Sequence, residues 1–270
     1  MSHFHGGFYS TGSALYPDWF PQWLLDYCLV HSAIIVSGEY RLLPESSGSD
    51  IFDDVSDFYE WMRKELQPEL SKLVPGIEAD LSKVAVQGPS AGGTLAVQSG
   101  FFQPRGFIKA VIATFPGLNV GAKRNNPILG LPMVPPSVLE DHLKNMKPGT
   151  IVTSVESLER FQVALSIAQQ TRTKDFYGSD EKLYPFKVLE KTENASYMLV
   201  LHGDNDTVVA VKGSIDFTEA MKNKFGDDNI DLVIRPGCEH GFDKDVALEE
   251  PWLKSALVKA TELWLGASEA

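Results

Sequence analysis

The segment that most constrains this chain is the hexapeptide GPSAGG at residues 88–93, which follows the apolar run 84–86. It has the G-x-S-x-G form of a nucleophile elbow, in which a strand turns sharply into a helix and presents a serine at the tip. Because backbone segments come close together in such a turn, the positions flanking the serine must be small. A plain glycine-rich turn with an exposed serine is the alternative, since short motifs recur by chance. The choice depends on whether the chain supplies partners for Ser90.

Length and composition are those of an ordinary globular chain. Its 270 residues, 43% of them hydrophobic, suffice for a sizeable core. The formal net charge of -12 argues against nucleic acid or an anionic membrane surface as a partner. No apolar stretch approaches the roughly 20 residues that span a bilayer. Residues 1–7 have neither a basic nor an apolar region of the kind a signal peptide has, so we expect none there. Cys28 and Cys238 are expected as free thiols, which favours a cytoplasmic location.

Strand and helix patterns alternate along most of the chain. Apolar and β-branched runs predict strands at residues 33–37, 83–87, 108–115, 197–201 and 230–234. Amphipathic or terminated patterns predict helices at residues 50–66, 94–99, 211–225 and 251–265, and an aromatic-rich segment could form another within 16–29. Such alternation predicts an α/β fold with a mostly parallel sheet and helices on both of its faces.

The alternation stops between residues 118 and 196, a proline-punctuated stretch with two short helical patterns. The clearer pattern starts at Thr153 with Glu156 three residues on, as in a capping box, and continues with Val155 on its apolar face. Because the alternation then resumes, we expect a single domain over 1–270, with 118–196 as a helical cap inserted after the strand that ends near Phe115. Five side chains of this insertion are candidates to line a substrate site, with plain packing equally open: Met133, Phe176, Tyr177, Tyr184 and Phe186.

Two loops after predicted strands offer partners for the serine. Ligands bind beyond the carboxyl ends of parallel strands, so catalytic groups are expected just after strands. Asp206 follows the strand 197–201 and His240 follows the strand 230–234, which gives the serine–acid–histidine order of an α/β-hydrolase. We expect His240 to take the proton of Ser90, and Asp206 to fix the tautomer of the imidazole and stabilise its charged form.

Other interpretations of these polar residues were weighed. Asp204 competes with Asp206, but it lies in the first bend of the loop, whereas Asp206 lies deeper and should reach further. His240 alone could be a loop residue that packs locally, and its place after the last strand favours catalysis. His202 is expected to be structural, with its ring supporting the turn. His31 and His142 fall in no motif and are expected to be surface or core residues. No His, Cys or carboxylate cluster has ligand spacing, so we expect no metal and no cofactor.

An acyl-transfer site also needs N–H donors aimed at the charge that develops on the substrate carbonyl. Ala91, directly after the serine, supplies one donor. The others are expected from Gly6, Gly7 and Phe8 of the N-terminal loop, where glycine lets the backbone approach a substrate closely. A plain glycine turn is again the alternative. Four side chains near the serine are expected to contact substrate: Phe8, Tyr9, Pro89 and Phe242.

With these segments assembled, the chain resembles the hormone-sensitive-lipase branch of the α/β-hydrolase superfamily. The matching segments are HGGF at 5–8, YRLLPE at 40–45, GPSAGG at 88–93 and HGF at 240–242, where the family reads HGGGF, YRLAPE, GDSAGG and HGF. The resemblance covers most of the chain apart from the insertion and implies an α/β-hydrolase fold. It also implies that the YRLLPE segment is structural, with Arg41 and Glu45 in buried polar contacts.

The chain departs from the family pattern at three points. Phe8 replaces the third glycine, so a side chain would crowd or shape the acyl site. Pro89 replaces the usual aspartate, which removes a carboxylate beside the nucleophile. Family members also carry a cap segment and further strands before the HGG loop. We therefore expect either a truncated form of a longer protein or a homo-oligomer that covers the exposed sheet edge.

The assembled features predict a serine carboxylic-ester hydrolase that acts through an acyl-serine intermediate on small to medium, fairly apolar esters. Proteins of this fold also serve as acyltransferases, cyclases or lyases in small-molecule biosynthesis, and the changes at Phe8 and Pro89 allow that alternative. A third alternative is a non-catalytic ligand receptor, because the plant gibberellin receptor resembles this family but has lost the catalytic histidine. The presence of His240 argues against a receptor.

Overall fold

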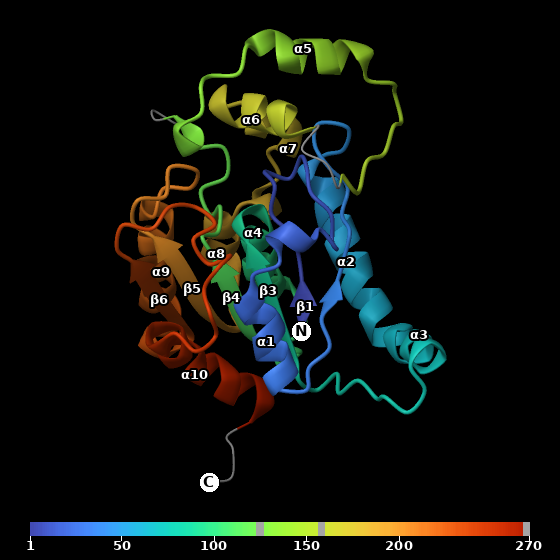
Figure 1. Ribbon diagram of the computed structural model, residues 1–270, viewed down its shortest axis with the longest axis vertical. Helices are drawn as coiled ribbons and strands as arrows, with labels where there is room; N and C mark the ends of the chain where they lie inside the picture. The colour runs from blue at the N-terminus through green and yellow to red at the C-terminus, as the bar shows by residue number, and fades with distance from the viewer. Residues whose placement is uncertain (123–126, 156–159, 267–270) are drawn as a thin grey trace.

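A six-stranded parallel sheet forms the centre of the computed structural model, which describes residues 1–122, 127–155 and 160–266 (Figure 1). The strand order is β2-β1-β3-β4-β5-β6, and every neighbouring pair runs parallel. The strands are β1 Ser2–His3, β2 Val36–Ser37, β3 Val84–Pro89, β4 Ile108–Thr114, β5 Tyr197–Gly203 and β6 Ile230–Arg235. The prediction of an α/β fold with a parallel sheet is confirmed.

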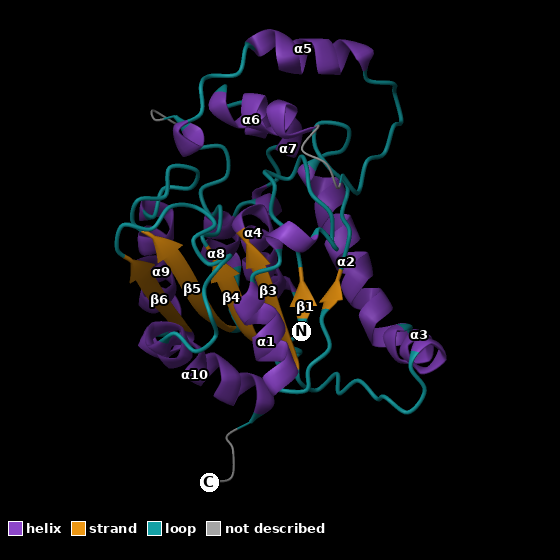
Figure 2. Cartoon of the chain, in the orientation of Figure 1, coloured by secondary structure: helices purple, strands orange, loops and turns teal. Residues whose placement is uncertain are grey.

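Helices cover both faces of this sheet (Figure 2). On one face, α1 and α10 bury Trp23, Leu24 and Leu253 against Ala85 and Ala110 of the strands. On the other face, α2, α4, α8 and α9 enclose a second apolar cluster. The helices are α1 Gln22–Val30, α2 Gly48–Lys64, α3 Leu66–Leu73, α4 Ser90–Phe102, α5 Pro136–Asn145, α6 Phe161–Gln169, α7 Thr173–Tyr177, α8 Pro185–Lys191, α9 Lys212–Phe225 and α10 Pro251–Leu265.

The first strand is only two residues long, yet it lies inside the sheet. Ser2 pairs with Val36 of β2 on one side and with Val86 of β3 on the other. Its side chain is fully buried, and its hydroxyl donates to the carbonyl of Ala85 at 3.1 Å. The N-terminal ammonium of Met1 donates to Ile34 at 2.8 Å, which continues the contact beyond the ladder. This short strand delivers the HGGF loop to the end of β3.

The segment 118–196 divides into two parts. Helices α5 and α6 stand above the carboxyl end of the sheet, whereas α7 and α8 return to its flank beside α2 and α4 (Figure 1). Tyr177 of α7 is completely buried, with its ring 4.9 Å from that of Tyr9. The name cap is used below for α5 and α6 with their approaches, whereas α7 and α8 pack with the core.

The helix predicted from Thr153 is wrong for its first residues. Residues 151–154 are not helical, and Val155 forms a β-bridge with Gly12, whose carbonyl accepts the Val155 N–H at 2.8 Å. Glu156, the other half of the expected capping box, lies outside the described residues. The helix begins only at Phe161. A long-range bridge to the N-terminal loop thus holds Val155 outside a helix.

Two further observations concern the chain as a whole. Within the three described ranges, no helix is long and apolar enough to cross a membrane. Cys28 is buried and Cys238 is half-buried, and both thiols are free, as predicted.

Candidate active site

The nucleophile elbow is the junction of β3 and α4. β3 ends at Pro89 and α4 begins at Ser90, which takes a left-handed φ of 54°. That conformation is strained for a residue with a side chain, and such strain clusters at functional sites. A Cβ at Gly88 would lie 2.3 Å from the carbonyl oxygen of Gly92, and one at Gly92 would lie 2.0 Å from that of Phe4. Only glycine fits at these two positions, so the elbow and the end of β1 are locked against each other.

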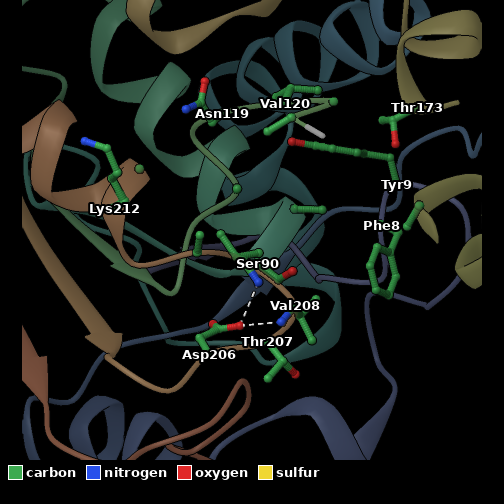
Figure 3. A pocket seen from close by; sticks show the side chains of 18 of the residues that line it. Phe8, Tyr9, Ser90, Asn119, Val120, Thr173, Asp206, Thr207, Val208 and Lys212 are labelled. Atoms are coloured by element: carbon green, nitrogen blue, oxygen red, sulfur yellow. Dashed lines mark hydrogen bonds between the residues drawn. The ribbon is translucent and has the colours of Figure 1, made fainter. Parts of the chain in front are cut away.

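Asp206 lies in the loop between β5 and α9, with its carboxylate wholly buried. Its Oδ1 accepts the N–H groups of Val208 at 2.8 Å and Val209 at 2.6 Å, bonds that Figure 3 shows beside Ser90. Its Oδ2 lies 2.7 Å from His240 Nδ1 and 3.2 Å from His202 Nε2. Burial by itself raises the pKa of Asp206, but the bonds from the two imidazoles and Val209 outweigh it and hold the pKa well below its usual value. The side chain is therefore an ionised acceptor.

His240 follows β6 and is oriented by this carboxylate. Because the acceptor is ionised, Nδ1 must carry the proton, which leaves Nε2 unprotonated in the neutral ring. The ring packs on Phe115 with centroids 4.4 Å apart and lines a cavity that Ser90 also lines. Asp204, the competing acid, instead accepts the N–H of Gly237 at 2.6 Å. The structure thus brings Asp206 to the imidazole, while Asp204 joins the two loops.

Glu239 also joins these loops, and sequence reasoning missed it. One oxygen of its carboxylate accepts the N–H of Thr207 at 2.6 Å and that of His240 at 2.7 Å. The other accepts the Thr207 hydroxyl at 2.8 Å. Glu239 therefore fixes the residue after Asp206 to the residue that carries the imidazole. An acid beside the histidine was the only signal in the sequence.

The N-terminal loop approaches the elbow from the other side. A Cβ at Gly6 would lie 3.4 Å from that of Ser90, so this backbone runs against the serine. Gly7 and Phe8 have left-handed φ values of 95° and 57°. Their N–H groups make no hydrogen bond to any residue that the structure describes. Ala91 lies in the first turn of α4, where N–H groups lack helical partners. These are the donors expected of an oxyanion hole, gathered around Ser90.

His5 and Tyr40 hold this loop in place. Burial lowers the pKa of His5 to about 4, so the ring is neutral, and its Nδ1 donates to the Gly6 carbonyl at 2.8 Å. The Tyr40 hydroxyl donates to the carbonyls of His5 at 2.8 Å and Gly6 at 3.1 Å, and the two rings stack. In a trans peptide the N–H points opposite to the carbonyl. Fixing the Gly6 carbonyl therefore fixes the direction of the Gly7 N–H.

The acid of the YRLLPE segment anchors the cap. The side chain of Glu45 is 4% exposed, and it pairs with Arg160 at 2.6 Å and with His142 of α5 at 2.9 Å. Arg160, which precedes α6, also donates to the carbonyl of Ser10 at 3.0 Å. Arg41 is only partly buried. It pairs with Asp50 of α2 at 3.1 Å and with Asp54 of the same helix at 2.9 Å. Burial by itself raises the pKa of Glu45, but the hydrogen bonds and charge of Arg160 outweigh burial, and the pKa lies below its usual value.

Two cavities meet at the serine. The first, of about 400 Å³, is lined by Ser90, Tyr9 and Lys212, and is called here the Lys212 cavity (Figure 3). The second, of about 460 Å³, is lined by Ser90 and His240 and is called the His240 cavity. Phe8 lines both.

The other expected contact residues are distributed unevenly. Pro89 lines the His240 cavity, whereas Phe242 lines neither cavity and packs on Phe115 at 5.9 Å and Trp252 at 6.2 Å. The five side chains of the insertion named above line neither cavity. Met133 is 63% exposed, and the others pack in or against the core. The insertion contributes instead Val120, Leu129, Phe161, Ala168 and Thr173. Within the described part of the chain, no group of three His, Cys, Asp or Glu side chains is placed to hold a metal.

Comparison with known proteins agrees with this geometry. The sequence model of the alpha/beta hydrolase fold family matches residues 1–242. The chain belongs to the α/β-hydrolase family. Its resemblance to the hormone-sensitive-lipase-like branch, drawn from the four motifs, is confirmed.

Two curated relatives are similar over most of their length. The chain is 30% identical to the "probable carboxylesterase M8" of Phoma sp. over 262 residues, which cover 93% of this chain and 81% of that protein. It is 30% identical to the "probable carboxylesterase clz11" of Cochliobolus lunatus over 202 residues, which cover 69% of this chain and 92% of that protein.

Solved structures share the fold at low sequence identity. Esterase 2 of Thermogutta terrifontis, phosphonylated by sarin, is 18% identical with a TM-score of 0.59. The match covers 97% of this chain and 81% of the esterase chain. An alpha/beta hydrolase superfamily protein from Enterococcus faecalis is 15% identical with a TM-score of 0.63. The match covers 98% of this chain and 89% of that protein's chain.

Proposed function

We propose that this protein is a serine hydrolase of carboxylic esters that works through an acyl-serine intermediate. The observation that carries the proposal is the hydrogen-bonded pair of Asp206 and His240, which borders the same cavity as the strained Ser90. The family membership and the carboxylesterase names of both curated relatives support an esterase activity. Arrangements of this kind are recognised by geometry and roles.

In the proposed acylation step, the oxygen of Ser90 attacks the carbonyl carbon of the ester while His240 Nε2 takes the hydroxyl proton. The carbonyl oxygen gains negative charge and is held by the N–H groups of Gly7, Phe8 and Ala91. The bond from the carbonyl carbon to the alcohol oxygen then breaks. His240 returns the proton to that oxygen, and the alcohol leaves.

Deacylation repeats these steps with water as the nucleophile. His240 takes a proton from water, the hydroxide oxygen attacks the acyl carbon, and the same N–H groups hold the second oxyanion. Release of the Ser90 oxygen, which regains the proton from His240, frees the carboxylic acid. Asp206, ionised throughout, keeps the proton of the ring on Nδ1 and stabilises the imidazolium.

The cavities support small to medium substrates. Volumes of about 400 and 460 Å³ suit groups of a few to a dozen heavy atoms on either side of the ester. Aromatic rings around His240, from Trp19, Phe115 and Phe161, support an apolar group there.

Hydrolysis of p-nitrophenyl butyrate by the wild-type protein and by Ser90→Ala tests the proposal. We expect kcat/KM of the variant to fall at least about 10³-fold. Mass spectrometry should find a fluorophosphonate probe attached to Ser90 in the wild type and absent from the variant. Ser99→Ala, on the same helix, serves as the matched control and should label normally. Equal rates for wild type and Ser90→Ala would refute the proposal, and acyl groups recovered on an added alcohol rather than on water would point to a transferase.

A further inference from the structure

Three residues separate the two cavities that meet at the serine. Phe8, Ser90 and Val208 line both cavities, and every other lining residue that the structure describes belongs to one cavity alone. The left-handed φ of Phe8 places a ring at the position where the related family sequences have a glycine without a side chain. Figure 3 shows this ring beside the cavity, across from Asp206. An ester bound at Ser90 must therefore send its two halves into different spaces.

His240 decides which half enters which space. The imidazole that takes the serine proton must return it to the leaving alcohol oxygen, so the alcohol lies on the side of His240. His240 lines only the second cavity. The alcohol part of the ester is then directed into the His240 cavity, and the acyl part into the Lys212 cavity.

The Lys212 cavity offers polar side chains to the acyl part. The Tyr9 side chain is 5% exposed, and its buried hydroxyl has no hydrogen-bond partner among the described residues. The hydroxyls of Thr94 and Tyr177 lie near it without reaching bonding geometry. Burial raises the pKa of Tyr9 to about 12, so the group is a neutral phenol. The hydroxyl is shielded from the cavity, so a ligand reaches it by a small shift of the wall. The bond that then forms removes the cost of a buried polar group without a partner.

Two further polar side chains border the same space. Asn119 and Thr173 line the cavity around Tyr9 (Figure 3), and neither side chain is engaged in a hydrogen bond within the described residues. Both come from the 118–196 insertion, Asn119 after β4 and Thr173 at the start of α7. Together with Tyr9 they present donors and acceptors without net charge.

Among the described residues, Lys212 is the one cation that lines this cavity, and its charge is already neutralised. Lys212 Nζ donates to both carboxylate oxygens of Asp216, at 2.7 and 2.8 Å. The ionised carboxylate of Asp206 lies at the same cavity. An anionic acyl group would face two carboxylates against one lysine, so the charges favour an uncharged polar group.

The His240 cavity has a different character. Trp19, Phe115 and Phe161 contribute aromatic rings, and Leu129 adds an aliphatic side chain. Asp18 and Lys244 of its lining are exposed residues, and Asp243 is buried with its carboxylate bonded to the Trp23 indole N–H at 3.1 Å. This lining suits an apolar alcohol.

We propose that the enzyme selects esters that join a short, uncharged, hydroxylated acyl group to an apolar or aromatic alcohol. Tyr9 is the residue that binds the acyl hydroxyl, and Asn119 and Thr173 assist it. This inference rests on the ester hydrolysis proposed above and names its substrate class. The reaction is plain hydrolysis: water adds to the acyl carbon, the bond from acyl carbon to alcohol oxygen breaks, and a hydroxy acid and an alcohol leave.

Four esters test the assignment, with kcat/KM as the readout. Benzyl 3-hydroxybutyrate carries the hydroxyl on the acyl side, and its isomer 2-hydroxypropyl phenylacetate has the ester group reversed. Benzyl butyrate lacks the hydroxyl, and monobenzyl succinate replaces it with a carboxylate. We expect benzyl 3-hydroxybutyrate to exceed each of the other three about tenfold or more, because a site built to bond a hydroxyl discriminates against its absence.

Each of the other possible results with these esters contradicts one part of the proposal. A preference for the reversed isomer overturns the assignment of the two cavities, and a preference for the succinate overturns the uncharged acyl group. Equal rates on butyrate and 3-hydroxybutyrate overturn the selection of a hydroxyl. If wild type and Ser90→Ala hydrolyse none of the four differently, the esterase function itself fails.

Substitution of Tyr9 tests the residue assignment. Tyr9→Phe removes only the hydroxyl and should lower the ratio of kcat/KM for 3-hydroxybutyrate over butyrate about 3- to 10-fold. Thr173→Val, nearly the same in shape, should lower the same ratio less. Tyr197→Phe is the matched control, because its hydroxyl bonds to Asp231 at 2.7 Å, outside both cavities. An unchanged ratio in Tyr9→Phe with a normal melting temperature would overturn the role of Tyr9.

Discussion

The catalytic loops and the cap are attached to the sheet in different ways. The catalytic loops, residues 204–209 and 236–243, are tied together by partly buried hydrogen bonds through Asp206 and Glu239. The cap, α5 and α6, has a cluster of its own with Leu139 and Val163, and Glu45 reaches it from the core. In the proposed mechanism the loops position the reacting atoms, whereas the cap is held by a polar anchor. Changes in the loops should act on kcat, and changes at the anchor should act on KM.

The largest effect is expected from Asp206→Asn. With Oδ1 held by Val208 and Val209, the new amide group would face His240 and force its proton from Nδ1 to Nε2. An imidazole protonated on Nε2 cannot accept the serine proton, so kcat should fall about 10³- to 10⁴-fold. Steady-state kinetics on p-nitrophenyl butyrate measure the loss.

Asp204→Asn is the matched control, because an amide oxygen can still accept the Gly237 N–H. We expect kcat to change less than about threefold, because the hydrogen bond to Gly237 is kept. A large loss in Asp204→Asn with a small one in Asp206→Asn would reverse the assignment of the acid.

The next effect concerns the stability of the second loop. Asp243 is 4% exposed and accepts the Trp23 indole N–H at 3.1 Å, and burial raises its pKa to about 6. A raised pKa stabilises the fold at low pH, and this contribution is lost as pH rises through about 6. Asp243→Asn keeps the acceptor without the charge. Its advantage in unfolding free energy should grow from near zero at pH 4 to about 3 kcal/mol at pH 8.

Urea unfolding of both proteins across this pH range measures the difference. Asp245→Asn, two residues on and exposed, is the control and should show no such trend. A constant difference between pH 4 and pH 8 would mean that Asp243 does not titrate in the folded protein.

Glu239 should have a smaller effect on catalysis, because it acts through its neighbours. Glu239→Ala removes the acceptor of both the Thr207 and His240 N–H groups. A displacement of His240 of about 1 Å costs up to about 10²-fold, so kcat should fall about 10- to 100-fold. Glu239→Gln keeps one oxygen for both N–H groups and should recover most of this activity. If Gln is as poor as Ala while both variants are stable, the charge of Glu239 matters rather than its hydrogen bonds.

Sequence reasoning was most effective where chemistry fixes residue types at strand ends. The elbow requires glycines around Ser90, and the order of Asp206 and His240 follows from the loops after β5 and β6. The sheet and most helices were also predictable, because apolar periodicity reports burial. α10 begins and ends at the predicted residues, Pro251 and Leu265.

Long-range contacts explain the parts that could not be predicted. β1 is too short for any periodicity, and its place beside Val86 comes from the tertiary fold. Val155 is drawn out of a helical pattern by Gly12. An apolar side chain of the insertion could either line the substrate site or pack in the core, and the sequence does not separate the two. Tyr177 packs in the core. The brace that Tyr40 gives to the Gly6 carbonyl was hidden for the same reason.

The smallest effect is expected at the cap anchor. Glu45→Gln leaves Arg160 without its carboxylate and places an amide against Arg160 or His142, but the bonds of Arg160 to the backbone remain. We expect KM to rise about 3- to 10-fold with kcat within about twofold, since the variant loses one ion pair of the cap. The lowered pKa of Glu45 means that the wild-type advantage fades as pH falls.

Glu140→Gln separates the anchor from the general charge of the cap. Glu140 lies on α5 and pairs with Arg172 at the surface, where an ion pair contributes little. Its substitution should change neither KM nor the rate of limited proteolysis, whereas Glu45→Gln should speed cleavage within α5 and α6. If Glu45→Gln lowers kcat as much as Glu239→Ala and leaves KM unchanged, the cap helps to position the reacting atoms. The division between loops that set chemistry and a cap that sets access would then have to be abandoned.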